Sequence, residues 1–281
     1  MKRPGSVMRL LGLILVILPL FTFIFKYEAS SDEAYLSEML LSSRTENIVN
    51  GESASDLNIT ALAGTLTQTG IPAVKRAYLT FDDGPSVNTD RILDILKMYG
   101  VKATFFVNNK KGDENILRYQ RIVSEGHTIG LHSSDHVYRS VYKDEQSFLT
   151  DYLNNQAYVA AACGVTPVIY RFPGGSDNLV SKKDTSCYIN ILNSLGIPYY
   201  DWNVYVGDAV KNILSGEALA ANALAGCAGK NDVMILMHDL PEKTTTADAL
   251  PAIIEGLTRM GYVILPVDTA VPSTTPVFHF K

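Results

Sequence analysis

The chain has 281 residues, of which 47% are hydrophobic and 19% are charged, a composition that excludes collagen-like and intrinsically disordered chains. Its formal net charge is −5, but four of its basic residues lie in the first 26 positions, which leaves 20 basic against 29 acidic residues, a balance of −9. Such an acidic domain is a poor candidate for nucleic-acid binding, which depends on contacts between basic side chains and phosphates.

The first segment, residues 1–26, is predicted to be a membrane anchor. Residues 10–25 form an uncharged apolar run with three basic residues before it and one after it. With its flanks the run approaches the ~20 residues that cross a bilayer, and the basic residues favour an N-terminus in the cytoplasm. We expect an uncleaved signal-anchor that crosses the cell membrane once and leaves the rest of the chain outside. Cleavage followed by secretion is the alternative.

Residues 27–73 are predicted to form an extracellular stalk. They are rich in Ser, Asp, Glu, Asn and Thr and contain only scattered apolar residues, with one short helix expected near 33–41.

From residue 74 to residue 270, short apolar runs alternate with longer stretches of helical period, the pattern of repeated strand–helix units. The predicted strands are 77–81, 103–107, 127–131, 168–171, 197–203, 232–237 and 262–266. The predicted helices are 89–99, 114–125, 143–163, 183–195, 218–228 and 247–260. Seven such units predict an α/β fold, either a barrel or a doubly wound sheet. Residues 271–281 contain two prolines and are expected to be a surface tail.

The chain has three cysteines, Cys163, Cys187 and Cys227. This odd, sparse set argues against a disulfide framework, although one pair could still form a bridge.

Two adjacent carboxylates, Asp82 and Asp83, follow the first predicted strand in the run Thr-Phe-Asp-Asp-Gly-Pro. A turn of the type Asp-Gly-Pro needs no function by itself. Two neighbouring carboxylates, however, repel each other unless a cation or a proton lies between them. One of them is suited to bind a metal ion while the other stays free as a base.

Two histidines, His132 and His136, follow the third predicted strand. At this spacing they share one face if the segment forms a helical turn, which suits a shared metal ion. With Asp83 they supply two nitrogens and one oxygen and leave a coordination position open for water, as in catalytic sites. A structural histidine pair is the alternative, and Asp135 is an alternative ligand that points off the shared face. The donor set favours Zn²⁺, with Co²⁺, Ni²⁺ or Mn²⁺ as alternatives.

Polar residues also follow three later strands. Arg171 precedes a Pro-Gly-Gly loop, where it is either an ordinary loop arginine or a guanidinium that binds a carboxylate through two hydrogen bonds. Asp201 lies near the end of the fifth predicted strand, and Asp208 follows that strand. His238 comes directly after the sixth, in a position suited to a general acid that a carboxylate orients.

Together and in this order, the five clusters resemble the motifs of the polysaccharide deacetylases that share the NodB homology domain, carbohydrate esterase family 4. The resemblance spans about residues 78–267 and is nearest to the peptidoglycan N-acetylglucosamine deacetylases. It implies a distorted (β/α)7 barrel. The roles that it implies are general base for Asp82, metal ligand for Asp83, His132 and His136, general acid for His238, and orientation of the base for Arg171.

The third motif departs from the family pattern. Gly174 stands where the family has a tyrosine. Its backbone N–H can still bind an oxyanion, but the aromatic wall is lost.

The fourth and fifth motifs contain the remaining predicted substrate residues. The best spacing makes Asp208 the carboxylate that orients the general acid, with Asp201 as the runner-up. Ala209 then replaces a tryptophan of the family. Trp202, the only tryptophan of the chain, either compensates from nearby or belongs to the core. Leu236, in the motif Leu-x-His, is expected to contact the substrate.

The resemblance implies hydrolysis of acetyl groups from a polysaccharide with release of acetate. Because the predicted anchor places the domain beside the cell wall, N-acetylglucosamine of peptidoglycan is the favoured substrate. Chitin oligomers and acetylated xylan are alternatives. A non-catalytic glycan-binding barrel and an unrelated metallohydrolase are rival interpretations. No obligate protein partner is expected.

Overall fold

The computed structural model describes residues 74–181, 184–210 and 213–269. The predicted anchor, the stalk with its short helix and the C-terminal tail lie outside the described residues. Among the helices of the described ranges, none is long and apolar enough to cross a membrane. All three cysteines are free thiols.

The described residues form a six-stranded sheet in which every paired strand is parallel to its neighbour. The strands are β1 (Lys75–Asp82), β2 (Thr104–Asn108), β3 (Thr128–Ser133), β4 (Val204–Tyr205), β5 (Asp232–His238) and β6 (Tyr262–Ile264). Their order is β3-β2-β1-β5-β4, and β6 pairs with the beginning of β1. The predicted α/β class is therefore confirmed, with the first predicted strand at the centre of the sheet.

Two of the seven predicted strands are not formed as continuous strands. In place of the strands predicted at 168–171 and 197–203, Tyr170 makes single bridges to Leu131 and Tyr199. Prolines lie in or next to both segments, 168–171 and 197–203, and a proline has no N–H to donate to a strand ladder. The bridges nevertheless continue the backbone pairing from β3 towards the short strand β4.

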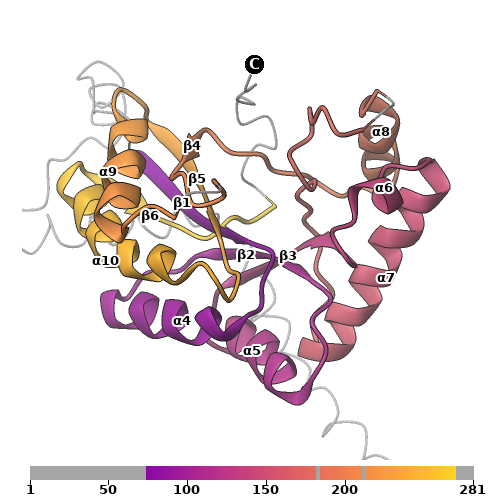
Figure 1. Cartoon of the computed structure of the whole chain (residues 1–281), viewed down its shortest axis with the longest axis horizontal. Helices are drawn as coiled ribbons and strands as arrows, with labels where there is room; N and C mark the ends of the chain where they lie inside the picture. Colours follow the sequence, from indigo (N-terminus) through magenta and orange to yellow (C-terminus); the bar gives the residue numbers. More distant parts are fainter. Residues whose placement is uncertain (1–73, 182–183, 211–212, 270–281) are drawn as a thin grey trace, which may run out of the picture. The chain divides into compact units, whose positions relative to one another are not determined.

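Helices cover the outer side of the sheet. They are α4 (Val87–Tyr99), α5 (Asp113–Ser124), α6 (Tyr138–Val141), α7 (Glu145–Cys163), α8 (Ser186–Ser194), α9 (Gly216–Cys227) and α10 (Thr244–Arg259). In Figure 1 the longer ones follow one another around the strands, and contacts join α9 to α10, α10 to α4, α4 to α5, α5 to α7 and α7 to α8. Six of these helices match the predicted ones, whereas the four-residue helix α6 was not predicted.

The two faces of β1 pack into different surroundings. Ala77, Leu79 and Phe81 are fully buried in the large apolar cluster that includes the helices. Tyr78 belongs to a smaller cluster on the other face, together with Phe106, Ile169, Tyr200, Met234 and Val267. Since side chains alternate along a strand, Asp82 at the end of β1 shares the face of Tyr78. The small cluster thus lies directly beneath the polar residues at the strand ends.

Candidate active site

The register of the sheet brings two distant motifs together. Asp82 and His238 are the last residues of β1 and β5, and they are paired across the ladder. The Asp239 N–H donates to the Asp82 carbonyl at 2.8 Å and extends the pairing by one step. Because parallel strands end at one edge of a sheet, the predicted base and the predicted acid are neighbours there.

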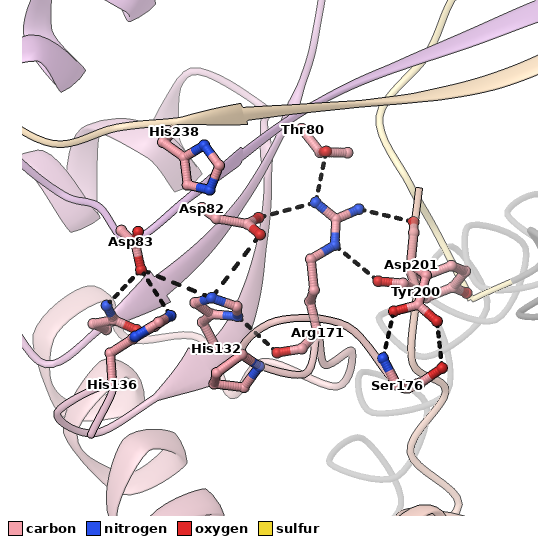
Figure 2. Close-up of polar contacts among 12 residues, drawn as sticks. Thr80, Asp82, Asp83, His132, His136, Arg171, Ser176, Tyr200, Asp201 and His238 are labelled. Carbon is pink, nitrogen blue, oxygen red and sulfur yellow. Dashed lines mark hydrogen bonds and ion pairs between the residues drawn. The ribbon is translucent and has the colours of Figure 1, made fainter. Parts of the chain in front are cut away.

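Arg171 holds Asp82 from within the protein. Its Nη1 donates to Asp82 Oδ1 at 2.9 Å and to Thr80 Oγ1 at 2.7 Å. Its Nε and Nη2 donate to the carbonyls of Tyr200 and Asp201 at 2.8 and 3.1 Å, as Figure 2 shows. The guanidinium is fully buried and lies 4.2 Å from the centre of the Phe106 ring. Arg171 contacts Asp82 as predicted, but through one hydrogen bond and not through the two that were expected, because its other N–H groups donate to Thr80, Tyr200 and Asp201.

Asp83 turns away from the strand into the same site. Its φ of 74° is in the left-handed region, which is uncommon for a residue with a side chain. Its N–H donates to the Phe106 carbonyl at 3.1 Å, and Asn108 Nδ2 donates to Asp83 Oδ1 at 3.1 Å. Burial raises the pKa of Asp83, but three nearby histidines outweigh it, so the pKa lies below its ordinary value. Asp83 is therefore held as a carboxylate.

His132 and His136 converge although they do not lie on a helical turn. His132 belongs to β3, and His136 lies in the loop after it with a φ of 57°. The His136 N–H donates to Ser133 Oγ at 3.0 Å, and Ser133 Oγ donates to Asp151 of α7 at 3.2 Å. This chain of hydrogen bonds folds the loop so that the two imidazole centres are 5.0 Å apart.

The three predicted metal ligands form a compact donor set. Their ligand atoms lie within 4.8 Å of one another, and Asp83 Oδ1 is 3.7 Å from His132 Nε2 and 3.4 Å from His136 Nε2. Nitrogen and oxygen ligands arranged tetrahedrally around one zinc ion stand about 3.3 Å apart, so the spacing fits one shared ion. Asp135 is not in this set, because its Oδ1 accepts the Val137 N–H at 2.9 Å.

The tautomer and charge of His132 also suit a metal ligand. Its Nδ1 donates to the Arg171 carbonyl at 2.7 Å, which leaves the lone pair on Nε2, the nitrogen that faces Asp83. Burial lowers the pKa of His132 despite the nearby carboxylates Asp82 and Asp83. The ring is therefore neutral, as metal coordination requires.

Asp208, and not Asp201, orients His238. Asp208 Oδ1 accepts from His238 Nδ1 at 2.8 Å, and its Oδ2 accepts the His238 backbone N–H at 2.7 Å. Thr246 Oγ1 also donates to Asp208 Oδ2 at 3.0 Å. Burial lowers the pKa of His238, but the hydrogen bond and the charge of Asp208 outweigh it, and the pKa is raised above its usual value.

Asp201, the runner-up for that role, binds a different loop. Its Oδ1 accepts the Ser176 N–H at 2.8 Å, and its Oδ2 accepts from the Ser176 hydroxyl. Ser176 follows Gly174 and Gly175, so Asp201 holds the loop that contains the predicted oxyanion donor.

The predicted substrate residues line one open cleft of about 590 Å³ above the metal ligands. Gly174, Trp202, Leu236 and Ala209 all border it. Trp202 is half-buried at the wall, which decides between the two interpretations of this residue in favour of the cleft. Sequence reasoning missed five further lining residues, which are Tyr138, Tyr205, Leu240, Glu242 and Lys243. Arg171 and Asp208 act from behind the cleft.

Asp239 is a buried carboxylate to which the sequence assigned no role. Its Oδ1 accepts from Ser86 Oγ at 2.6 Å and its Oδ2 from Thr89 Oγ1 at 2.5 Å, so it anchors the beginning of α4. A Cβ at Gly84 would overlap Asp239 Oδ2, so the glycine of the first motif makes room for this carboxylate. Burial raises the pKa of Asp239 to about 6, although the two hydroxyls oppose the shift.

We expect the replacement Asp239→Asn to change the pH dependence of stability. The folded protein favours the protonated form of Asp239. The stabilisation that this group contributes is therefore complete below the pKa that Asp239 has in the unfolded chain, and it is lost as the pH rises through the folded-state pKa of about 6. Relative to the variant, the unfolding free energy of the parent should fall by about 2 kcal/mol between about pH 4.5 and pH 7. Urea unfolding of both proteins at several pH values measures this difference. Parallel pH profiles would contradict the prediction.

The chain is similar to known proteins in both sequence and structure. The family model of the polysaccharide deacetylases matches residues 69–200. A peptidoglycan-N-acetylglucosamine deacetylase of Bacillus cereus is 33% identical over 192 residues, which cover 67% of this chain and 67% of that protein. The catalytic domain of a peptidoglycan N-acetylglucosamine deacetylase from Eubacterium rectale superposes with a TM-score of 0.67 at 38% identity, covering 72% and 92% of the two chains. A Streptococcus mutans CE4 esterase superposes with a TM-score of 0.63 at 31% identity, covering 73% of this chain and 91% of that one.

Proposed function

Because this chain belongs to the polysaccharide deacetylase family, we propose that it removes N-acetyl groups from the N-acetylglucosamine of peptidoglycan in a metal-dependent hydrolysis. One observation carries the proposal. Asp82, which an arginine holds, and His238, which a carboxylate holds, are paired across β1 and β5, beside three side chains that could bind a metal ion. Base, acid and metal site are the parts that amide hydrolysis needs.

Asp83, His132 and His136 would hold the metal, for which we propose Zn²⁺ because two imidazoles and one carboxylate are typical of zinc sites with an open position. When bound there, the ion supplies Lewis acidity to the acetamide group and its attacking water. The neutral His132 and the ionised Asp83 are already in the protonation states that ligands require.

The residues of the chain move two protons. Asp82 takes a proton from the water that adds to the acetyl carbon, while Arg171 holds one of its oxygens and fixes its direction. The Gly174 N–H stabilises the charge that develops on the carbonyl oxygen. His238 gives a proton to the sugar nitrogen as the C–N bond breaks. The products are acetate and a free amino sugar.

The substrate follows from the relatives and the proposed location. The names of the Bacillus cereus and Eubacterium rectale proteins specify peptidoglycan N-acetylglucosamine. A catalytic domain anchored by residues 1–26 on the outer face of the cell membrane would lie beside that polymer. Other relatives are a chitin deacetylase at 30% identity and a bifunctional xylanase/deacetylase at 32%, so chitin oligomers and acetylated xylan belong in the test.

The test is acetate release by the full-length protein, purified in a mild detergent, from N-acetylated peptidoglycan, chitin oligomers and acetylated xylan in parallel. We expect release from peptidoglycan that a chelator abolishes and Zn²⁺ restores. Release from another of the three glycans would keep the reaction and replace the substrate. If the protein binds metal but releases no acetate from any of them, the catalytic proposal is wrong and a glycan-binding barrel is favoured.

We expect the replacement Asp208→Asn to shift the pH profile of this reaction. His238 must carry its proton to act as the acid, and the charge of Asp208 raises its pKa. Without that charge, His238 loses its proton at lower pH, so the basic limb of the kcat/KM profile moves towards acid. At about pH 8 the loss should be about tenfold or more, and it should be smaller at about pH 6. A uniform loss across the pH range would argue against His238 as the acid.

A further inference from the structure

Tyr138 is an aromatic residue at the cleft that no motif predicts. It is the first residue of α6 and borders the cleft with 37% of its surface exposed. The edge-to-face contact of its ring with His136 has a centre-to-centre distance of 5.1 Å. An exposed aromatic ring beside a metal ligand is placed to meet whatever enters the cleft.

The ring of Tyr138 is supported from behind. It stacks on Tyr142 with 6.3 Å between centres and 14° between planes. Tyr142 is buried, and its hydroxyl donates to the Pro173 carbonyl at 2.7 Å. Tyr188 in turn donates to the Tyr142 carbonyl at 2.9 Å. This stack fixes Tyr138 against the loop that contains the glycine pair, so that little side-chain entropy remains to be lost when a ligand binds.

The glycine pair, Gly174 and Gly175, lies between two aromatic rings. A Cβ at Gly174 would lie 3.5 Å from Cε1 and the hydroxyl oxygen of Tyr138. A Cβ at Gly175 would lie 3.3 Å from Cη2 of Trp202. Both glycines have positive φ, 78° and 90°, where a side chain is strained. The loop thus has no side chain of its own at these positions, and rings from two other segments approach its backbone.

The hydroxyl of Tyr138 has no hydrogen-bond partner among the described residues, and it lies beside Gly174, which also borders the cleft. A phenolic hydroxyl can donate a hydrogen bond, so this group is available as a donor to a ligand.

We propose that Tyr138 is a substrate-contacting residue that selects for a sugar: its ring packs against the pyranose that carries the acetamide, and its hydroxyl donates to an oxygen of that sugar. Tyr138 thereby provides the aromatic wall whose loss the sequence suggested at Gly174. The proposal rests on the proposed function, because it assigns a contact to the same acetylated sugar.

Three variants separate the ring from the hydroxyl. Tyr138→Ala removes both, Tyr138→Leu keeps apolar bulk against Tyr142 but no ring, and Tyr138→Phe removes only the hydroxyl. Val137→Ala is the matched control, because Val137 is the adjacent residue, is similarly exposed at 36% and does not border the cleft. The readouts are KM and kcat for acetate release from the glycan that the parent protein hydrolyses, and the bound metal content.

We expect Tyr138→Ala and Tyr138→Leu to raise KM about tenfold while kcat changes less than about threefold and metal content stays at the parent level. Tyr138→Phe should raise KM by at most about fivefold, the effect of one hydrogen bond, and Val137→Ala should leave it unchanged. An unchanged KM in Tyr138→Leu, or a loss of metal that accounts for the whole effect, overturns the proposal. A parent protein that is inactive on every acetylated glycan would instead overturn the proposed function.

Discussion

Replacing Asp82 by asparagine is expected to lower kcat/KM about a thousandfold, which corresponds to about 4 kcal/mol of transition-state stabilisation. Asparagine has nearly the same shape and can still accept the hydrogen bond from Arg171 Nη1, but it cannot take a proton from water. Because Asp82 is outside the set of three metal ligands, the variant should bind metal as the parent does. The measurement is steady-state acetate release with the metal content determined for the same sample.

The control for this experiment is Asp248→Asn. Asp248 forms an ion pair with Arg91 at 2.5 Å in which both side chains are about half exposed, and neither residue borders the cleft. The Asp248→Asn variant loses one carboxylate, as Asp82→Asn does, and it should keep the parent activity. If Asp82→Asn retained more than about a tenth of the parent kcat/KM, another group would have to be the base.

Replacing Arg171 by methionine is expected to lower the free energy of unfolding by about 3–5 kcal/mol and to reduce activity as well. The guanidinium is fully buried and donates to Asp82, Thr80, Tyr200 and Asp201. Without it, the Asp82 carboxylate is left buried without its cationic partner, and two backbone carbonyls lose their donor. Urea unfolding at constant metal concentration measures the loss.

The double variant with Asp82→Asn and Arg171→Met identifies the cause of that loss. If the unpaired charge of Asp82 dominates, the double variant should be more stable than Arg171→Met alone, because no buried carboxylate remains at this position. If the two changes instead add, the carbonyls of Tyr200 and Asp201 would account for the destabilisation. A loss below about 1 kcal/mol for Arg171→Met would show that the arginine is dispensable for folding.

Much of the site was predictable because it lies at strand ends. Parallel strands end at one edge of a sheet, so polar residues after apolar runs were expected to meet there. Asp82, Asp83, His132 and His238 lie together as that argument requires. Their chemical roles remain predictions that the variants test.

Other features depend on contacts between distant residues, which spacing along the chain does not determine. Spacing favoured Asp208 over Asp201 but could not show that Asp201 binds Ser176, 25 residues earlier in the chain. The helix α6 is only four residues long, too short to give a periodic signal, so Tyr138 was missed. Two predicted strands are reduced to single bridges because prolines near their apolar runs have no N–H for a strand ladder. The apolar pattern that predicted these strands carries no information about a missing N–H.

The pairing of Asp82 with His238 across β1 and β5 separates the reaction from the choice of substrate. Backbone hydrogen bonds of the sheet fix the two residues to which we assign proton transfer. Of the cleft walls, Leu236 and Tyr205 come from strands β5 and β4, whereas Tyr138, Trp202 and Glu242 come from α6 and from loops. Loops tolerate exchange far better than paired strands do. An engineer could therefore graft new walls at Tyr138, Trp202 or Glu242 to change which acetylated sugar is accepted, and leave the proposed acid–base pair of the scaffold untouched.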